Sequence, residues 1–215
     1  MTPGGLATLI ESAAGAGTAT ATDRTTARIL DAAVTEAASV GINRITVEDV
    51  VRRAGVSRMT AYRRYPRRDD LIEALVHRET HRFLAAVSAG IAAAPAPGEA
   101  VVEAYVAAVA FARGHPMLRR AAHTDSALPG PETVALLEMG RSFIAAHINT
   151  GSATPDQPPS QQVRWVADVF ARLFLTYLSA PPRDPDFDDE AQVRRFANEI
   201  LTPMVAQALS GQPLS

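Results

Sequence analysis

The feature that most constrains this fold is a pair of short helical segments joined by a tight turn between residues 46 and 66. Thr46 caps the first segment, whose apolar positions have helical spacing: Val47, Val50, Val51 and Ala54. Gly55 permits the turn, Ser57 caps the second segment, and Pro66 ends it. Two helices joined in this way form a helix-turn-helix unit, whose second helix lies in the major groove of DNA. The spacing therefore predicts a DNA-binding unit.

Helical spacing interrupted by helix breakers extends over the rest of the chain. A first helix is expected from Asp23, as its N-cap, to Gly41, and a fourth from about Arg67 to Ala93. Prolines then separate helices predicted over about 99–113, 116–123, 131–149, 160–179 and 188–209, and Pro203 should kink the last one. Because no stretch alternates polar and apolar residues for long, the sequence predicts an all-α protein of about nine helices. Residues 1–22 are expected to form a disordered tail.

Composition and charge narrow the class of protein. The chain has 215 residues and no cysteine, which suits the reducing cytoplasm, where we expect the protein to act. We expect no membrane span, because no apolar run reaches about 18 residues. We also expect no signal peptide, because the N-terminus lacks a basic start followed by an apolar core. Residues 24–82 contain 12 arginines against 8 acidic residues, whereas residues 83–215 contain 9 against 13. Positive charge gathered in one segment favours a polyanion as partner.

Two kinds of DNA contact are expected from the second helix of the unit. Arg58 lies in its first turn and can bind guanine bidentately, which discriminates between bases by about 1–3 kcal/mol. The expected base contacts come from Arg58, Met59 and Thr60. The expected phosphate contacts come from Tyr62, Arg63, Arg64 and Arg68. The caps Thr46 and Ser57 complete the predicted DNA-binding set, although a solvated arginine face explains the spacing alone equally well.

Residues 26–76 resemble the N-terminal domain of TetR-family regulators through the run TVEDVVRRAGVSRMTAYRRYPRRDDLIEALV. The positions that match the family motif are Gly55-Val56-Ser57, Thr60-Ala61-Tyr62, Tyr65, Pro66, Arg68, Asp69, Asp70 and Leu71. Four positions depart from it. Ala61 replaces a larger aliphatic residue, Arg64 a residue that is often His, Tyr65 a Phe, and Arg67 a Ser or Asn cap. These departures leave the family resemblance intact but make the detailed DNA contacts less certain to predict. Tyr65, just before Pro66, is expected to lie in the core.

The resemblance implies two domains, a DNA-binding domain over residues 23–66 and a helical domain over 67–215 that dimerises and holds an effector pocket. In the family the last two long helices form a four-helix bundle with the partner. The implied interface residues are Val169, Leu173, Tyr177, Phe196 and Ile200. Candidate pocket residues are Phe83, Val87, Tyr105, Val109, Met139, Phe143, Trp165 and Phe174. These side chains favour a hydrophobic or amphipathic effector, and ordinary core packing is the competing explanation for each of them.

No metal, cofactor or catalytic site is expected. The histidines and acids that could suggest a metal site match no zinc spacing: His115, His123, His147, Asp125 and Asp168. The sequence has no nucleophile elbow, P-loop or dinucleotide fingerprint, so we expect no enzyme. The prediction is a dimeric repressor released from a palindromic operator by a small hydrophobic effector. An activator or effector-independent DNA-binding regulator is the alternative, and a helical enzyme or carrier is a remote one.

Overall fold

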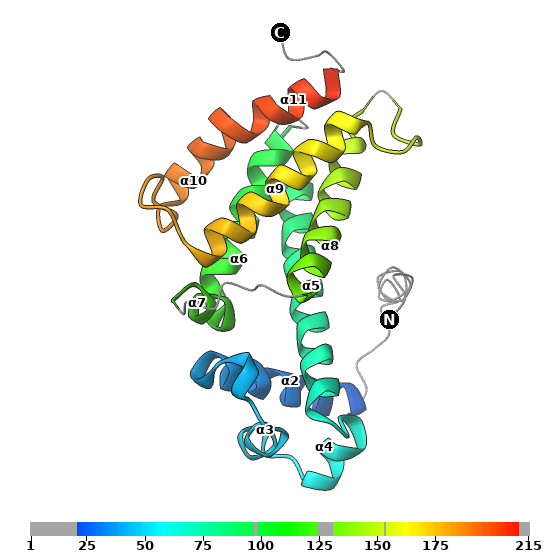
Figure 1. The fold of residues 1–215 in the computed structure, drawn as a ribbon, viewed down its shortest axis with the longest axis vertical. Coiled ribbons are helices and arrows are strands. Elements are labelled where there is room, and N and C mark those ends of the chain that lie inside the picture. Colours follow the sequence, from blue (N-terminus) through cyan, green and yellow to red (C-terminus); the bar gives the residue numbers. More distant parts are fainter. Residues whose placement is uncertain (1–20, 97–98, 124–130, 153, 211–215) are drawn as a thin grey trace.

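The computed structural model describes residues 21–96, 99–123, 131–152 and 154–210, and every regular element in these ranges is helical (Figure 1). The α-helices are α2 (Ala21–Val40), α3 (Val47–Ala54), α4 (Arg58–Arg64), α5 (Arg68–Ala93), α6 (Ala100–Gly114), α7 (Pro116–His123), α8 (Pro131–Asn149), α9 (Gln161–Ser179), α10 (Glu190–Phe196) and α11 (Thr202–Ser210). A 3-10 turn, η1 (Ile42–Arg44), follows α2, and a π turn, η3 (Ala197–Leu201), joins α10 to α11. The tail expected over residues 1–22 lies outside the described residues, except for its last two, which belong to α2.

The all-helical prediction is confirmed, with nine helices in the described ranges when α10, η3 and α11 count as one interrupted helix. The N-cap predicted at Asp23 was wrong because α2 already includes Ala21. Alanine is the strongest helix former, so the helix need not wait for the first residue able to cap it. The π turn lies just before Pro203, where the missing N–H breaks the regular hydrogen-bond ladder.

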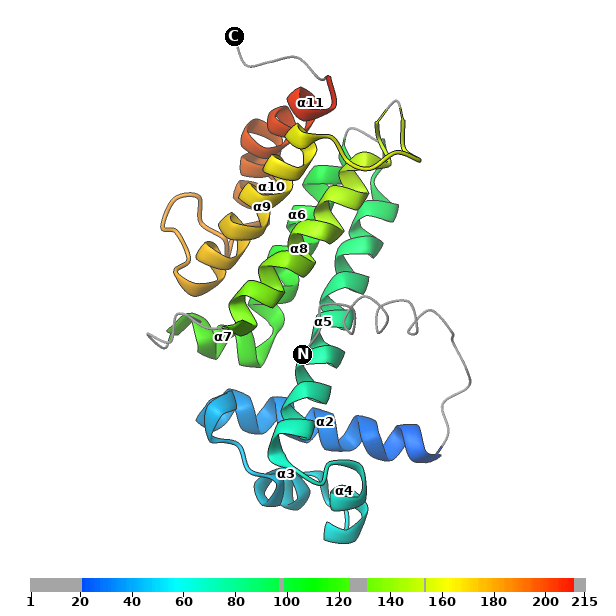
Figure 2. The same ribbon diagram turned by 45° about the vertical axis from the view of Figure 1, so that its right-hand side comes forward.

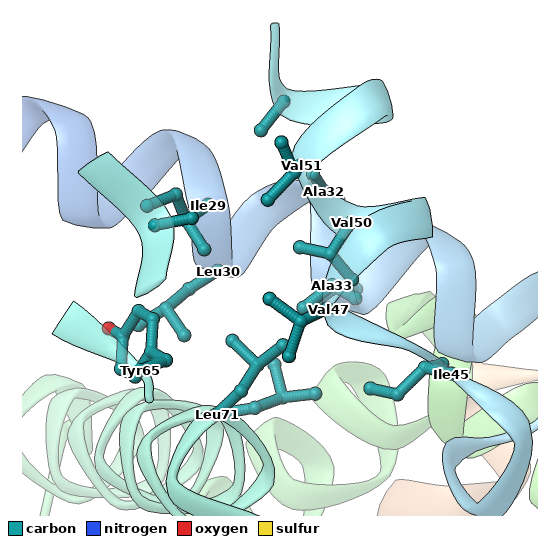
Figure 3. Packing of buried hydrophobic residues seen from close by; sticks show 14 of the residues in the cluster. Ile29, Leu30, Ala32, Ala33, Ile45, Val47, Val50, Val51, Tyr65 and Leu71 are labelled. Atoms are coloured by element: carbon teal, nitrogen blue, oxygen red, sulfur yellow. The ribbon is translucent and has the colours of Figure 1, made fainter. Parts of the chain in front are cut away.

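The first apolar core lies between α2, α3, α4 and the beginning of α5 (Figure 3). Ile29 of α2 and Val50 of α3 are fully buried, and Leu71 and Leu75 of α5 complete the core. Ala61 is the buried residue of α4, and Tyr65 packs beside it as expected. The part of α5 that contributes to this core lies beyond the domain boundary predicted between residues 66 and 67. That boundary stays a prediction.

The remaining helices form a second body around two further apolar clusters. In this body α5 packs along α6, and α8 packs along α9 (Figure 2). A Cβ atom at Gly90 would lie 2.7 Å from the Glu103 carbonyl oxygen, so glycine permits the close approach of α5 and α6. No helix in the described part of the chain is long and apolar enough to cross a membrane.

Candidate DNA-binding surface

Helix α4 lies at the end of the molecule opposite α11, where the larger helical body does not cover it (Figures 1 and 2). Local capping places it there. The Thr46 hydroxyl oxygen accepts a hydrogen bond from the Asp49 N–H at 3.1 Å, and the Ser57 hydroxyl accepts from the Thr60 N–H at 3.1 Å. Gly55 has a φ of 62°, in the left-handed region that ends α3. These three positions confirm the helix ends predicted from the sequence.

The turn between α3 and α4 is also held from outside the unit. Arg28 of α2 donates hydrogen bonds to the carbonyl oxygens of Ala54 at 2.8 Å and Gly55 at 3.3 Å. These carbonyls end α3, where a cation is favoured by the helix dipole. The sequence did not predict this contact, because the two acceptor residues lie 26 and 27 positions after Arg28 in the chain. Arg28 therefore ties the turn that precedes α4 to α2.

Three predicted DNA-binding residues lie free on the outer face of α4. The Met59 side chain is 83% exposed, although it is large and apolar. Arg58 and Arg63 are also exposed, and neither forms a hydrogen bond or ion pair with any described residue. A large exposed apolar side chain between two unpaired guanidinium groups suits the base edges and phosphates of a DNA groove.

The other predicted side chains of α4 are engaged within the protein. The Tyr62 hydroxyl donates to the Glu48 carboxylate in the first turn of α3, and this hydrogen bond lowers the pKa of Glu48. The Thr60 and Ser57 hydroxyls lie 2.8 Å apart, and Arg64 donates to the Thr26 hydroxyl at 3.1 Å. These contacts fix α4 against α2 and α3, so DNA must compete for them.

Arg68, the last residue of the predicted set, also has protein partners. Its Nε donates to the Ile45 carbonyl oxygen at 2.9 Å, and one terminal nitrogen donates to the Ile42 carbonyl oxygen at 3.0 Å. Arg68 thereby ties the start of α5 to the η1 segment that leads into α3. Its geometry indicates a positioning role, and the phosphate contact assigned to it stays a prediction.

A buried charge network connects the DNA-binding helices with the larger body. Glu79 of α5 is 6% exposed and accepts hydrogen bonds from Arg78 at 2.6 Å and Arg82 at 3.2 Å. Its carboxylate also lies 3.0 Å from Nε2 of His115, which begins the turn into α7. Arg78 in turn donates to Asp31 of α2 at 2.8 Å. The network therefore joins α2, α5 and the α6–α7 junction.

Helix α7 makes a second connection between the two parts. Arg120 donates to the Ser39 carbonyl oxygen near the end of α2 at 2.7 Å, and Met117 packs against the first core. On its other side, α7 lines a cavity of about 110 Å³ between α6, α9 and the segment that follows α9. The lining includes Val109, Leu118, Arg119, Phe174, Leu178 and Phe187.

The cavity includes two of the eight predicted pocket residues, Val109 and Phe174. The ring of Phe83 stacks on that of Phe174, with centroids 5.2 Å apart, just behind the lining. The other candidates lie outside the lining: Val87, Tyr105, Met139, Phe143 and Trp165. Trp165 is 62% exposed, because this position of α9 faces outward, so the structure places it on the surface.

The predicted interface residues divide in a similar way. Val169 of α9 and Ile200 of η3 are 45% and 49% exposed, and Trp165 lies one turn before Val169. The remaining three pack partly against the second apolar cluster: Leu173, Tyr177 and Phe196. Helical spacing could not decide this division, because α9 has apolar residues round most of its circumference.

Known proteins with related sequences share more than the DNA-binding helices. Residues 29–75 match the family model of bacterial regulatory proteins, tetR family. The uncharacterized HTH-type transcriptional regulator Rv1255c of Mycobacterium tuberculosis H37Rv is 32% identical over 188 residues, which cover 84% of this chain and 87% of the relative. Mb2274c of Mycobacterium bovis, of the same description, is 29% identical over 184 residues, covering 84% of this chain and 77% of its own. The similarity therefore continues into the larger helical body.

Solved structures show the same fold. The TetR family repressor AlkX from Dietzia sp. strain DQ12-45-1b, implicated in biodegradation of n-alkanes, has a TM-score of 0.61 at 20% identity, covering 89% of this chain and 98% of its own. A tetR-family transcriptional regulator from Streptomyces coelicolor has a TM-score of 0.58 at 17% identity, covering 89% and 90%. At these identities the similarity concerns the fold alone.

Proposed function

This chain belongs to the TetR family of DNA-binding transcriptional regulators, and from that premise we propose that it is a homodimeric repressor. It binds a two-fold symmetric operator through α4 and is released by a small hydrophobic or amphipathic effector. Because its target is bacterial DNA, we place it in the cytoplasm. The observation that carries the proposal is the outer face of α4, where Arg58, Met59 and Arg63 lie exposed at the uncovered end of the molecule.

The exposed residues of α4 support contact with both bases and phosphates. Arg58 lies in the first turn, from which recognition helices contact base edges, and Met59 can pack against thymine methyl groups. Arg63 lies one turn further on and can bind a phosphate. One such unit covers a short DNA segment, so tight binding needs a second copy.

The exposed apolar residues Trp165, Val169 and Ile200 support α9 and η3 as the dimer surface. Large apolar side chains gathered on neighbouring helices favour burial against another protein surface. In a two-fold dimer the same surface serves both copies, so one apolar face is sufficient. The two copies of α4 are then expected to enter successive major grooves, about 34–36 Å apart.

Replacing Val169 with Glu tests the dimer directly. We expect the dissociation constant of the dimer to rise at least about 100-fold, because each copy would bury an unpaired carboxylate in an apolar interface. Sedimentation equilibrium measures the dissociation constant. Ala146→Glu is the matched control, since Ala146 is exposed on α8 and receives the same charge. If Val169→Glu leaves the dimer as stable as Ala146→Glu does, the interface does not lie on this face of α9.

The position of α7 supports a response to an effector. Leu118 and Arg119 line the cavity, while Arg120, the next residue, holds the end of α2. A ligand that displaces α7 therefore acts on a contact of the DNA-binding helices. The ligand changes DNA affinity only if it binds one arrangement of α7 more tightly than the other. The cavity, about 110 Å³, is small beside ligand pockets of about 300–1,000 Å³.

That small volume favours one second candidate function, a regulator that works without an effector. In vitro selection of duplex DNA first supplies the operator, which should be palindromic. Operator binding is then titrated with short-chain carboxylates, alcohols and simple aromatics. On the main proposal, at least one compound weakens binding of the wild type but not of Leu178→Trp, which fills the cavity from α9. If no compound changes operator binding, the effector-independent function is favoured.

A further inference from the structure

Two histidines lie one turn apart on the same face of α5, His77 and His81. Their Nε2 atoms are 3.1 Å apart, and the ring centroids are separated by 4.3 Å with an interplanar angle of 58°. Both side chains are half-buried. Neither belongs to the DNA-binding surface, the cavity or the exposed apolar face of α9. From this geometry we propose that His77 and His81 form a binding site for a transition-metal dication of the zinc, copper or nickel class.

The separation of the two nitrogens fits joint coordination of one ion. With metal–nitrogen bonds of about 2.0–2.1 Å, two ligand nitrogens lie about 2.9 Å apart at a right angle and about 3.3 Å apart at the tetrahedral angle. The observed 3.1 Å falls between these values. Imidazole is a preferred ligand of zinc, copper and nickel. Histidines at i and i+4 on one helix face are also the pair that known helical zinc sites use.

Coordination requires a lone pair on both Nε2 atoms. In the metal-free pair a hydrogen bond between them needs one Nε2–H donor and one Nε2 acceptor. When the metal binds, the donor ring moves its proton to Nδ1, so both rings stay neutral and both Nε2 lone pairs face the ion.

Surrounding charges suit a cation. Glu73 lies one turn before His77 on the same side of α5, and its carboxylate interacts electrostatically with that ring. The guanidinium groups of the neighbouring Arg78 and Arg82 are both hydrogen-bonded to Glu79. The described residues contain no group of three or more metal-ligating side chains, so water would fill the remaining coordination positions. The site is therefore an open two-histidine site, and its affinity should be moderate.

The test is isothermal titration of the full chain, freed of any histidine tag, with zinc chloride and then copper chloride. We expect one ion per chain and at least about tenfold weaker binding in His77→Gln and in His81→Gln. His147→Gln is the matched control, because His147 lies on α8 with its Nδ1 2.9 Å from the Phe143 carbonyl oxygen. Zinc should also raise the Tm of the wild type and of His147→Gln, but not of His81→Gln.

The proposal fails if neither ion binds below millimolar concentration, or if both His77→Gln and His81→Gln bind as tightly as the wild type. It also fails if His147→Gln loses as much affinity as they do. Circular dichroism of each variant separates loss of the site from loss of the fold, and either of the two site variants suffices if the other does not fold. None of these measurements involves DNA, so their result is independent of the proposed repressor function.

Discussion

Replacing Arg58 with Ala is expected to weaken binding to the selected operator about 5- to 150-fold, because a bidentate arginine–guanine contact is worth about 1–3 kcal/mol. The Arg58 guanidinium forms no hydrogen bond or ion pair with any described residue, so its loss should not disturb the fold. Fluorescence anisotropy with labelled operator duplex measures the effect. The same variant should lose less affinity for an unrelated duplex, because the base contact of Arg58 is made only with the operator sequence.

Arg195→Ala is the control for charge alone. Arg195 is 77% exposed on α10 and pairs with Glu199, far from α4, so removing it changes the net charge equally. Arg63→Ala provides a second comparison, since loss of one phosphate contact should reduce the salt dependence by about 0.9 in the slope of log K against log salt. Equal affinities for Arg58→Ala and Arg195→Ala would show that this helix face does not contact bases.

Replacing Glu79 with Ala is expected to lower the free energy of unfolding by about 3 kcal/mol or more. Removing one partner of a buried ion pair typically costs about 3–5 kcal/mol. The lower end of this range applies here, because Arg78 keeps its ion pair with Asp31. Here Arg78 and His115 would lose their shared acceptor in the interior. Urea denaturation measures the change. Glu199→Ala, which removes a half-exposed carboxylate paired with Arg195, should stay within about 1 kcal/mol of the wild type.

The same glutamate should make stability depend on pH in the acid range. Burial by itself raises the pKa of Glu79, but hydrogen bonds from His115 and Arg78 and the charges of Arg78 and Arg82 outweigh it and lower the pKa below 4.5. A carboxyl group whose pKa is lower in the folded than in the unfolded state stabilises the fold at pH values above its unfolded-state pKa. This stabilisation is lost as the pH falls through the folded-state pKa. The difference in unfolding free energy between wild type and Glu79→Gln should therefore shrink below about pH 4.5. A difference that grows there would contradict the assigned direction.

The features predicted correctly from the sequence depend on residues close together in the chain. Thr46, Gly55 and Ser57 act on groups within three or four positions of themselves, so a local pattern contains all the information needed. The same locality explains why most predicted helix limits agree closely with the structure. The exception is the alanine-rich beginning of α2, where the predicted limit was wrong. Alanine continues a helix without leaving a visible boundary.

The features that the sequence could not supply join distant residues. Arg28 reaches the end of α3, and Glu79 reaches His115 across 36 positions, with no local motif for either contact. The orientation of α9 was equally undetermined. Its apolar residues surround the helix, so only packing against α8 and α11 decides that Trp165 faces outward. The same limit applies to α4, where Tyr62 and Arg64 turned out to have partners on neighbouring helices.

The way α5 is shared has a consequence for how such chains can be recombined. Its first turns supply Leu71 and Leu75 to the core beneath α2 and α3, and the same unbroken helix then packs along α6. A segment that ends at residue 66 would lack Leu71 and Leu75 and would expose that core to solvent. A chimaera that transfers this DNA specificity to another sensor must therefore carry the chain through Leu75 and join the two parents inside a helix, in register. The modules of this protein are interchangeable only in units of helical turns.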